Sequence, residues 1–516
     1  MRELLLVILP LAAAGVAAAW PDDRTRPLLL PVTGVAHAAL SLWLLIAAPG
    51  AALTPWFGYD PLARAVLPAV SLLFLACAVY GVPYLRLRGE RPNRVFVSLF
   101  LAMLGLMSLA HQALHLGVLW ISVEAVTLST VPLIHFNNTA RAYEATWKYL
   151  LVGGTGIALS LLGSFALGYA SLHGGGEGDL TFTALIAQGA ALSRPWVLTA
   201  WVLVLVGYGT KMGLAPMHTW KPDAYGEAPG IVGAMLAGGV TTVAFTAILR
   251  VRAVVDAAGQ GAVTHRTMLA LGLFSVLVAA LFMLATRDFK RLLAYSSIEH
   301  MGILSLGAAL GGAGLWAALF HVWNNTMTKG ALFLTAGNIR RAAGARTVDE
   351  VRGMAWLTPR SAMLFVIGLF AVTACPPFGP FFSELGIVRA TVAGGHGVVA
   401  ALLLFCLLLA FCGMTRLVFA VVDGRPRAGT RKGLDRMRER AALLVSPMAL
   451  LLISMGLGLF TPRTLQHCWQ EAVQQVGGEV PPAPTTSADI AGATATDPVT
   501  PPPPVLATTH SSKPRS

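Results

Sequence analysis

The sequence predicts an all-α polytopic membrane protein, and composition and patterning point to this fold class. Of 516 residues, 56% are hydrophobic and 12% are charged, with a mean hydropathy of +0.69. A soluble domain would carry about 25% charged residues. The apolar residues gather in runs of about 20, the length a helix needs to cross a bilayer. Because lipid leaves backbone polar groups no water partner, such runs predict helices.

About fourteen runs meet this length criterion. The first also resembles a signal peptide, but the next run follows at once, so we expect a retained first helix. The run 180–192 is too short to span and is expected to lie in the membrane interface. The predicted spans are 2–20, 28–48, 63–84, 94–112, 113–135, 147–170, 196–220 (broken), 229–249, 267–286, 291–311, 315–337, 361–393 (broken), 397–421 and 441–461.

The net charge of +13 lies mainly in loops between the predicted spans. We attribute it to the enrichment of Lys and Arg in cytoplasmic loops and not to a nucleic-acid partner. Fourteen spans place four basic clusters on one side, predicting a multi-pass protein of the inner (cell) membrane with these loops cytoplasmic and both termini outside. Arg250 and Arg252 would fall on the wrong side. The clusters are Arg86/Arg88/Arg91/Arg94, Arg287/Lys290/Arg291, Arg340/Arg341/Arg346 and residues 425–440.

The cysteines and histidines indicate no redox centre or metal site in this chain. Its five cysteines form no CxxC pair, and most lie within predicted spans. Neither an iron–sulfur ligand set nor a disulfide framework is apparent. His111 and His115 have a spacing that suits a metal, but no third ligand is evident. We therefore expect no cofactor and no metal bound by this chain.

Four charged residues lie inside apolar runs: Glu124, Lys211, Lys329 and Glu384. A charged side chain at the centre of a membrane helix costs about 2.5–3.5 kcal/mol on insertion scales. Such residues usually mark an ion or proton path. The alternative is that paired charges hold helices together. We favour a path because two of the charges lie beside helix breaks.

The breaks occur at "KMGLAPMH" (211–218) and at "PPFGPFFSE" (376–384). Proline removes a helix hydrogen bond and clashes with the preceding turn. Broken helices with charges at the break are typical of transporters built from inverted repeats. The two breaks lie five predicted spans apart, and an odd offset reverses the direction across the membrane. This predicts two inverted five-helix repeats, each with one broken helix.

The predicted domains follow from these repeats. We expect N-terminal transmembrane helices over 1–94, a first repeat over 95–252 and a second repeat over 265–421. A basic loop and the last transmembrane helix occupy 422–462. The remaining residues, 463–516, end in a segment rich in Pro, Thr, Ala and Ser, and we expect them to be a disordered tail.

Pairs of buried acid and base suggest how a proton would move. We expect Lys211 to pair with Glu124, and Lys329 with Glu384, because a carboxylate beside a buried lysine makes its protonation switchable. His218, His300 and His321 lie in or beside spans and titrate near neutrality. Each is a candidate relay member or, alternatively, a hydrogen-bonded core histidine.

Three ordered blocks carry a family resemblance: "GYGTKMGLAPMHTWKPDAYGEAP" (207–229), "RDFKRLLAYSSIEHMGIL" (287–304) and "FHVWNNTMTKGALFLTAGNI" (320–339). The chain resembles the proton-translocating, antiporter-like subunits of respiratory complex I and membrane-bound hydrogenases over roughly residues 95–420. The forms "SSIEHMG" and "MTKGALFLTAGN" are most similar to the hydrogenase-4 component F branch, of the formate hydrogenlyase type.

The resemblance implies a role for each matching residue. The family's central glutamate matches Glu124, and its broken-helix lysine matches Lys211. Its next lysine matches Lys329, with His321 beside it, and its second broken-helix charge matches Glu384. Together with the relay candidates, the expected proton path comprises Glu124, Lys211, His218, Glu299, His300, His321, Lys329 and Glu384, of which Glu299 and His300 look specific to the hydrogenase-like branch.

The chain also departs from the family pattern. Several members have a lysine or histidine in the helix after the broken one, but residues 232–249 contain no titratable group. Asn325 stands where some relatives carry histidine. A water chain held by Thr241 or Thr242 would bridge the gap. Without such a bridge the path would be interrupted and the chain would be a structural subunit.

The resemblance favours a proton-translocating membrane subunit of a respiratory or hydrogenase-type complex, with no catalytic residues of its own. Nickel–iron and iron–sulfur centres or quinone would then belong to partners, namely other membrane subunits and a peripheral hydrogenase or quinone-reducing module. Three alternatives remain open. They are a cation/proton antiporter subunit, a subunit of an inorganic-carbon uptake complex, and a non-pumping membrane scaffold.

Overall fold

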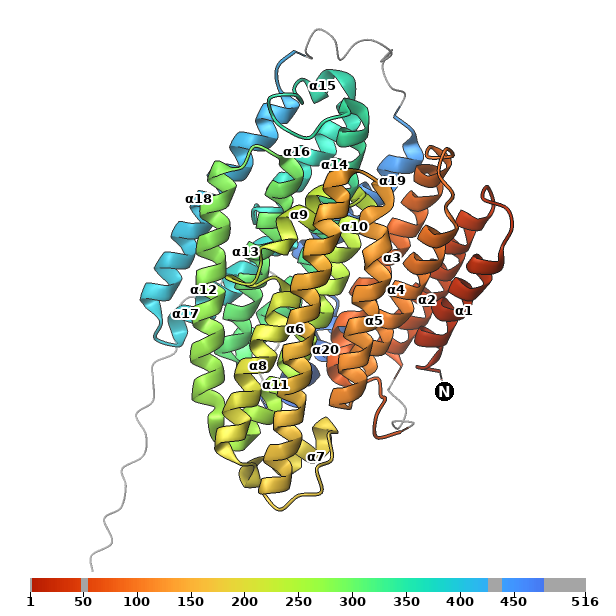
Figure 1. The fold of residues 1–516 in the computed structure, drawn as a ribbon. Coiled ribbons are helices and arrows are strands. Elements are labelled where there is room, and N and C mark those ends of the chain that lie inside the picture. The colour runs from red at the N-terminus through yellow and green to blue at the C-terminus, as the bar shows by residue number, and fades with distance from the viewer. Residues whose placement is uncertain (1, 48–53, 426–438, 478–516) are drawn as a thin grey trace, which may run out of the picture.

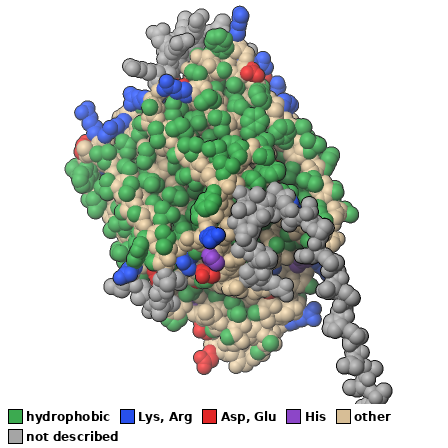
Figure 2. All heavy atoms as spheres, turned by 180° about the vertical axis from the view of Figure 1, so that it is seen from behind, with side chains coloured by type: hydrophobic (Ala, Val, Ile, Leu, Met, Phe, Trp, Pro, Cys, Tyr) green, Lys and Arg blue, Asp and Glu red, His purple; other side chains and the backbone are tan. Residues whose placement is uncertain are grey.

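A computed structural model describes residues 2–47, 54–425 and 439–477 of the chain (Figure 1). Over these ranges the fold is all-helical, with only isolated β-bridges and no strand. Eight of the described helical segments are long and apolar enough to cross a bilayer. Hydrophobic side chains cover most of the face seen in Figure 2, and charged side chains lie mainly toward its two ends. The fold class is therefore that of a multi-pass membrane protein.

Every predicted span contains a helix or a pair of helices, although the count of fourteen spans stays a prediction. The short segment 180–192 forms only α7 (Phe182–Ala187) and the 3₁₀ turn η3 (Gly189–Ala191). The N-terminal helices are α1 (Leu5–Ala19), α2 (Leu29–Ile46), α3 (Pro61–Arg86), α4 (Arg94–Gln112), α5 (Leu116–Ile134), α6 (Ala140–His173), α8 (Arg194–Met212), α9 (Trp220–Glu227), α10 (Gly230–Met235), the π-helix η4 (Leu236–Val240) and α11 (Thr241–Val255). The remaining helices are α12 (Gly261–Ala285), α13 (Phe289–Leu310), α14 (Gly312–Ala343), α15 (Met354–Leu357), α16 (Pro359–Val372), α17 (Gly379–Ala393), α18 (Gly397–Val422), α19 (Ala441–Leu459) and α20 (Arg463–Gln475).

Both predicted helix interruptions are present. Helix α8 ends at Met212 because Gly213 adopts a left-handed conformation with φ +84°, and Pro216 then prevents the helix from resuming. Helix α9 begins only at Trp220. The second interruption separates α16 from α17 over residues 373–378, where two prolines occur in succession.

Helix α14 lies at the centre of the bundle. It packs against α13, α16, α17, α19, α10 and α3, and nearly every residue from Gly314 to Ala336 is buried. Close approach between other helices depends on small residues. Gly272 of α12 and Gly302 of α13 face each other so closely that a Cβ on either would lie 2.6–2.8 Å from the opposite carbonyl oxygen.

The basic clusters meet at one end of the molecule, at the top of Figure 1. One cavity there is lined by Arg88 and Arg91 after α3, by Lys290 of α13 and by Arg340 of α14. A neighbouring cavity joins the end of α14 to Arg440 at the start of α19. The four clusters therefore share one side, as the sequence predicts, although residues 426–438 of the last cluster lie outside the described residues.

Arg250 and Arg252 are not an exception to this charge pattern, because both are buried and paired. Arg250 forms an ion pair with Asp60 and donates to the carbonyl oxygen of His111 at 2.7 Å. Arg252 pairs with Asp256 at 3.0 Å. Because carboxylates neutralise their charges, these two arginines add little net positive charge to the end of the molecule at which they lie.

The expectation of a disordered tail from residue 463 is wrong for its first part. Residues Arg463–Gln475 form α20, which packs against α3 and α14. Its apolar side chains Leu465, Trp469, Ala472 and Val473 all lie on one buried face, and this amphipathic pattern explains why the segment folds. Residues 478–516 lie outside the described residues.

Trp469 anchors α20 in an aromatic cluster with Trp316, Phe320 and Trp323, and is fully buried. We expect Trp469→Ala to lower the free energy of unfolding by about 3–5 kcal/mol because it leaves a large cavity. Thermal unfolding of the purified chain in detergent measures this change. The matched control is Trp356→Ala, since Trp356 is 70% exposed. Equal unfolding midpoints for the two variants would contradict the anchoring role.

Candidate functional site

Four lysines are fully buried. Lys290 of α13 lies at the basic end, where it donates to the carbonyl oxygens of Gly226 and Ala228, and the other three lie on α8, α9 and α14. Lys211 of α8, Lys221 of α9 and Lys329 of α14 are 1%, 0% and 0% exposed. Burial of an ammonium group requires polar partners, because an unpartnered charge is strongly destabilising in a low-dielectric interior. The partners of each lysine therefore define the site.

Lys211 is held by a tyrosine and not by a carboxylate. Its Nζ donates to the hydroxyl oxygen of Tyr149 at 3.0 Å and lies 4.4 Å from the centre of the tyrosine ring. The Tyr149 hydroxyl in turn lies 2.6 Å from Oγ1 of Thr130. The lysine stands one residue before the end of α8, so its position is fixed by the helix break.

The predicted Lys211–Glu124 pair is not a direct ion pair. Glu124 lies on α5 and acts electrostatically on Lys211, but Oε2 of Glu124 is buried without a hydrogen-bond partner in the described part of the chain. Tyr149, on the neighbouring helix α6, occupies the hydrogen-bonding position instead. The tyrosine was not predictable, because the sequence gives no information on which side chain reaches across from α6.

Lys221 is a site residue that the sequence pattern alone does not single out. Its Nζ donates to the backbone carbonyl oxygen of Met212 at 2.7 Å, and the ammonium lies 5.6 Å from the centre of the Tyr225 ring. Because α8 stops at Met212, that carbonyl has no helical partner. Its signal in the sequence is a second lysine ten positions after Lys211, in a run that resembles a loop.

Lys221 is a buried titratable group on α9, whereas residues 232–249 contain none. It interacts electrostatically with Lys329. The predicted water-bridging residues Thr241 and Thr242 donate instead to carbonyl oxygens of their own helix, at 2.7 and 2.6 Å. Lys221 is therefore a second candidate, beside the threonines, for the connection between the lysines of α8 and α14.

Lys329 is linked to Glu299 and not directly to Glu384 as we expected. Its Nζ donates to Oγ of Ser296 at 2.5 Å, and Ser296 donates to Oε2 of Glu299 at 3.3 Å. Ser296 and Glu299 are three residues apart on α13, so they face α14 together. Glu384 interacts with Lys329 only through its charge, because α17 places its carboxylate beside His300.

A cluster of two histidines and Glu384 adjoins Lys329. Nδ1 of His300 and Nε2 of His321 lie 2.8 Å apart, and Nδ1 of His321 lies 2.9 Å from Oγ of Ser383. Oε1 of Glu384 lies 3.9 Å from Nδ1 of His300. The residues come from α13, α14 and α17, and all are buried. The two histidines and Ser383 form a short hydrogen-bonded chain, and Glu384 lies next to it beyond hydrogen-bond distance.

Within the described part of the chain, this cluster is also the one group of three potential metal ligands. One ligand atom each from His300, His321 and Glu384 lies within 4.8 Å of the others. Two imidazoles and a carboxylate form a ligand set that Zn²⁺ accepts. In the structure, however, the two imidazoles are hydrogen-bonded to each other, which a shared metal would prevent. The expectation of no metal stays a prediction.

His218 lies apart from the other candidates. It stands on the unwound segment between α8 and α9, is half-buried, and packs near the Phe282 ring of α12 at 6.4 Å between ring centres. No hydrogen bond joins it to another predicted site residue in the described ranges. The break therefore brings Lys221 into the interior, whereas it leaves His218 near the surface.

The alternative metal pair does not form a ligand set. His111 is buried beside Thr246, with 3.3 Å between Nδ1 and Oγ1. His115 instead caps α5, and its Nδ1 accepts a hydrogen bond from the backbone N–H of Gly117 at 3.1 Å. Partial burial lowers the pKa of His115, which keeps the ring neutral and able to accept at neutral pH.

Several buried polar atoms near the lysines have no protein partner among the described residues. Both amide atoms of Asn325 are buried in this way, as is Nε2 of His300. Asn325 lies one helical turn before Lys329 on α14. Buried amides are nearly always hydrogen-bonded. The hydroxyl groups of Tyr208, Tyr225 and Ser305 share this property.

Comparison with known proteins shows the class to which this arrangement belongs. Residues 113–410 match the family described as NADH:quinone oxidoreductase/Mrp antiporter, TM. The chain therefore belongs to this family of antiporter-like membrane subunits.

Two curated relatives show which members of the family this chain is similar to. The chain is 36% identical over 337 residues to "Hydrogenase-4 component F homolog" of Methylacidiphilum infernorum, covering 65% of this chain and 71% of the relative. It is 32% identical over 426 residues to NADH-quinone oxidoreductase subunit N of Desulforudis audaxviator, covering 80% and 84%. The resemblance drawn from the sequence motifs is thereby confirmed.

Solved structures share the fold at lower sequence identity. A chain of the membrane-bound sulfane sulfur reductase, an archaeal respiratory membrane complex, superposes with a TM-score of 0.81 at 22% identity, covering 95% of this chain and all of that one. A chain of the Mrp complex from Dietzia sp. gives a TM-score of 0.80 at 22% identity, covering 92% and 99%. The helix arrangement is therefore shared with membrane subunits of multisubunit complexes.

Gly213 is required by both its conformation and its neighbour. A Cβ at this position would lie 2.8 Å from Nζ of Lys221, and the φ of +84° is unfavourable for other residues. We expect Gly213→Ala to lower the free energy of unfolding by about 1–2 kcal/mol. Thermal unfolding in detergent measures it. Gly154→Ala is the control, since nothing lies within 4 Å of its Cβ. A stable Gly213→Ala would show that the break tolerates rearrangement.

Proposed function

We propose that this chain is the proton-translocating membrane subunit of a multisubunit redox complex. The observation that carries the proposal is a row of three buried lysines, each hydrogen-bonded to a neutral oxygen atom. Ionisable groups inside a membrane protein usually mark a substrate or ion path. A purely structural role would favour direct ion pairs, and the described residues contain none at these lysines.

The proposed path runs from Glu124 through Lys211, Lys221 and Lys329 to the cluster of His300, His321 and Glu384. Tyr149 connects to the first lysine, and Ser296 and Glu299 connect to the third. Each lysine can release its proton without first breaking a contact ion pair. His218 is omitted from the central path because of its position near the surface.

Electrostatic repulsion between protonated lysines would drive protons along the proposed path. Lys221 and Lys329 repel each other when both are protonated. Protonation of one therefore favours release from the other, and the effect is strong because the interior has a low dielectric constant. A change in charge at a partner subunit would bias this row of sites in the same way.

Water completes the proposed path where side chains do not touch. Asn325 and the hydroxyl groups of Tyr208 and Tyr225 have buried polar atoms that need partners. Water molecules bound by these groups would link Lys221 to the sites on either side. This replaces the bridge that we expected at Thr241 and Thr242.

The helix order supports two five-helix repeats, as the sequence predicts. The first would comprise α4, α5, α6, the broken pair α8/α9 and α10–α11. The second would comprise α12, α13, α14, the broken pair α16/α17 and α18. The fourth member of each set is interrupted. We propose that the end with the basic clusters faces the cytoplasm across the inner membrane.

Electron transfer would take place in partner subunits. Relatives of this chain are named as components of a hydrogenase and of an NADH-quinone oxidoreductase. We propose that this chain likewise assembles with other membrane subunits and a peripheral redox module. Nickel–iron and iron–sulfur centres or quinone would be bound there. This chain would convert their turnover into proton movement.

The function is tested by removing the first buried lysine. We expect Lys211→Ala in vesicles holding the intact complex to reduce proton uptake about tenfold or more, which corresponds to about 1.4 kcal/mol in the barrier. Partner redox turnover and assembly are assayed in parallel. The control is Lys148→Ala, an exposed lysine. Unchanged proton uptake with normal assembly would favour the scaffold alternative, and sodium-dependent uptake would favour cation/proton antiport.

Lys221 allows a test that separates proton transfer from structure, because it also holds the Met212 carbonyl oxygen by a hydrogen bond. Lys221→Gln keeps a hydrogen-bond donor on a side chain that is one bond shorter, but its amide cannot take up or release a proton at neutral pH. We expect it to assemble normally and to lose proton uptake to about the same extent as Lys211→Ala. Lys221→Leu is the comparison that removes both properties. Retained pumping in Lys221→Gln would show that the lysine only fixes the helix break.

A further inference from the structure

We propose that the basic end of this chain holds an anionic phospholipid in a cleft between α3, α14, α16 and α19. Two cavities lie on either side of Arg440, with volumes of about 640 and 410 Å³. Arg440 lines both, and we treat the two neighbouring cavities together as one candidate cleft. This inference concerns a region away from the buried lysines and does not depend on the proposed proton path.

Four arginines surround the cleft at one depth. Arg86 is the last residue of α3, and Arg440 directly precedes α19. Arg341 lies in the last turn of α14, and Arg360 lies in the first turn of α16. Because each stands at the end of an apolar helix, we expect their guanidinium groups to lie at the depth of the lipid headgroups. Arginine binds the phosphodiester of a headgroup through paired N–H groups.

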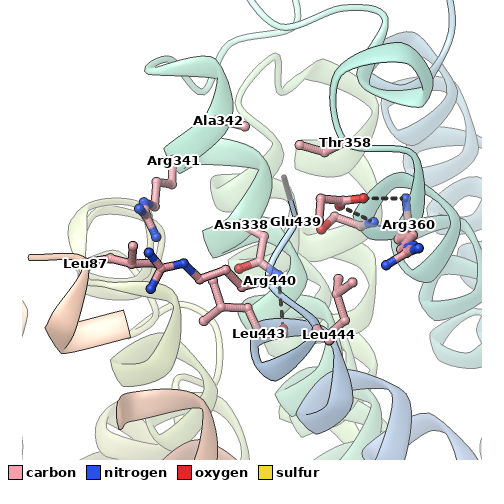
Figure 3. A pocket seen from close by; sticks show the side chains of 12 residues that line it. Leu87, Asn338, Arg341, Ala342, Thr358, Arg360, Glu439, Arg440, Leu443 and Leu444 are labelled. Carbon is pink, nitrogen blue, oxygen red and sulfur yellow. Dashed lines mark hydrogen bonds between the residues drawn. The ribbon is translucent and has the colours of Figure 1, made fainter. Parts of the chain in front are cut away.

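The positive charge of the cleft is not compensated by the protein. The described residues contain no ion pair at Arg86, Arg341, Arg360 or Arg440. Among the described residues of the lining, Glu439 is the only carboxylate, and it is already hydrogen-bonded. Its oxygens accept hydrogen bonds from the backbone N–H groups of Arg360 and Ser361 at 2.9 and 2.8 Å (Figure 3). The arginines exceed this carboxylate by three charges, and an anionic ligand would stabilise them.

Apolar side chains form the remaining walls. Leu87, Leu443 and Leu444 line the larger cavity, and Figure 3 shows them below and beside Arg341 and Arg440. The smaller cavity is lined by Pro31, Val79, Val82, Pro83 and Ala442 around Arg86 and Arg440. Val79 is 37% exposed, so this wall continues onto the membrane-facing surface.

This combination selects a lipid over other anions. A free phosphate or an acidic peptide would satisfy the arginines but would leave the apolar wall along α2, α3 and α19 exposed. A phospholipid satisfies both, with its phosphate among the guanidinium groups and its acyl chains against the wall. Neighbouring segment 426–438 is an unsuitable occupant, because its sequence adds five basic residues and one acidic residue.

The bound lipid would join parts of the chain that are distant in sequence. It would bridge α3 of the N-terminal region, the end of the central helix α14 and the start of α19. Repulsion among the arginines would otherwise push these helix ends apart. The lipid is therefore expected to stabilise the basic end of the molecule.

The test measures lipid-dependent stability of the full-length chain in detergent. Delipidated protein is supplied separately with dioleoyl-phosphatidylglycerol, dioleoyl-phosphatidylcholine and inorganic phosphate. We expect phosphatidylglycerol to raise the unfolding midpoint by several degrees more than phosphatidylcholine, and phosphate to have little effect. Native mass spectrometry should show retained phosphatidylglycerol.

A charge-matched pair of variants locates the effect. Arg341→Gln/Arg440→Gln should lose at least half of the phosphatidylglycerol-specific shift. Arg266→Gln/Arg463→Gln removes the same charge from other exposed arginines outside the cleft and should keep the shift. If the double variant does not fold, Arg440→Gln alone and the lipid comparison on the unmodified chain decide the matter. An equal shift with phosphatidylcholine or with free phosphate, or an unchanged shift in the cleft variant, would overturn the proposal.

Discussion

The arrangement of this molecule depends on the need to surround buried ammonium groups with oxygen atoms. A helix in lipid uses its carbonyl groups internally, so an uninterrupted span offers few acceptors to a lysine. The break after Met212 frees a carbonyl, and Lys221 uses it. The break also returns the chain to the interior as α9, so that the second lysine approaches the bundle centre. Backbone interruption and buried charge are therefore parts of one arrangement.

Central helix α14 connects the two halves of the candidate site. It carries both Lys329 and His321, and its other faces contact α13 and α17. The partners differ on the two sides of the row. Lys211 is bonded to a tyrosine hydroxyl, whereas Lys329 reaches a carboxylate through a serine. The two lysines therefore have different surroundings, and their proton affinities need not be equal.

The sequence predicts the elements better than it predicts their contacts. The length of the apolar runs locates the helices within the predicted spans, and glycine and proline residues locate both breaks. Both features depend on local sequence. Pairing between side chains depends on how helices pack. For this reason the expected partner of Lys329 was incorrect, and Tyr149 could not be foreseen. Helix α20 was missed because the low-complexity residues after it dominated the composition, although its amphipathic pattern is clear. Lys221 was missed because the break made its surroundings resemble a loop.

Charge asymmetry between the two ends is clearer in the structure than in the sequence. Counting the predicted spans places Arg250 and Arg252 on the side of the membrane opposite to the four basic clusters. Ion pairs with Asp60 and Asp256 remove this conflict, since a neutralised arginine does not contribute to the net charge of its end. Arg64, which pairs with Glu471, behaves in the same way. At the opposite end some arginines are paired, such as Arg340 with Glu227 and Arg291 with Asp223. Arg341 and Arg440 have no ion pair among the described residues. Unpaired cations such as these are the residues available to bind anions from the surrounding membrane.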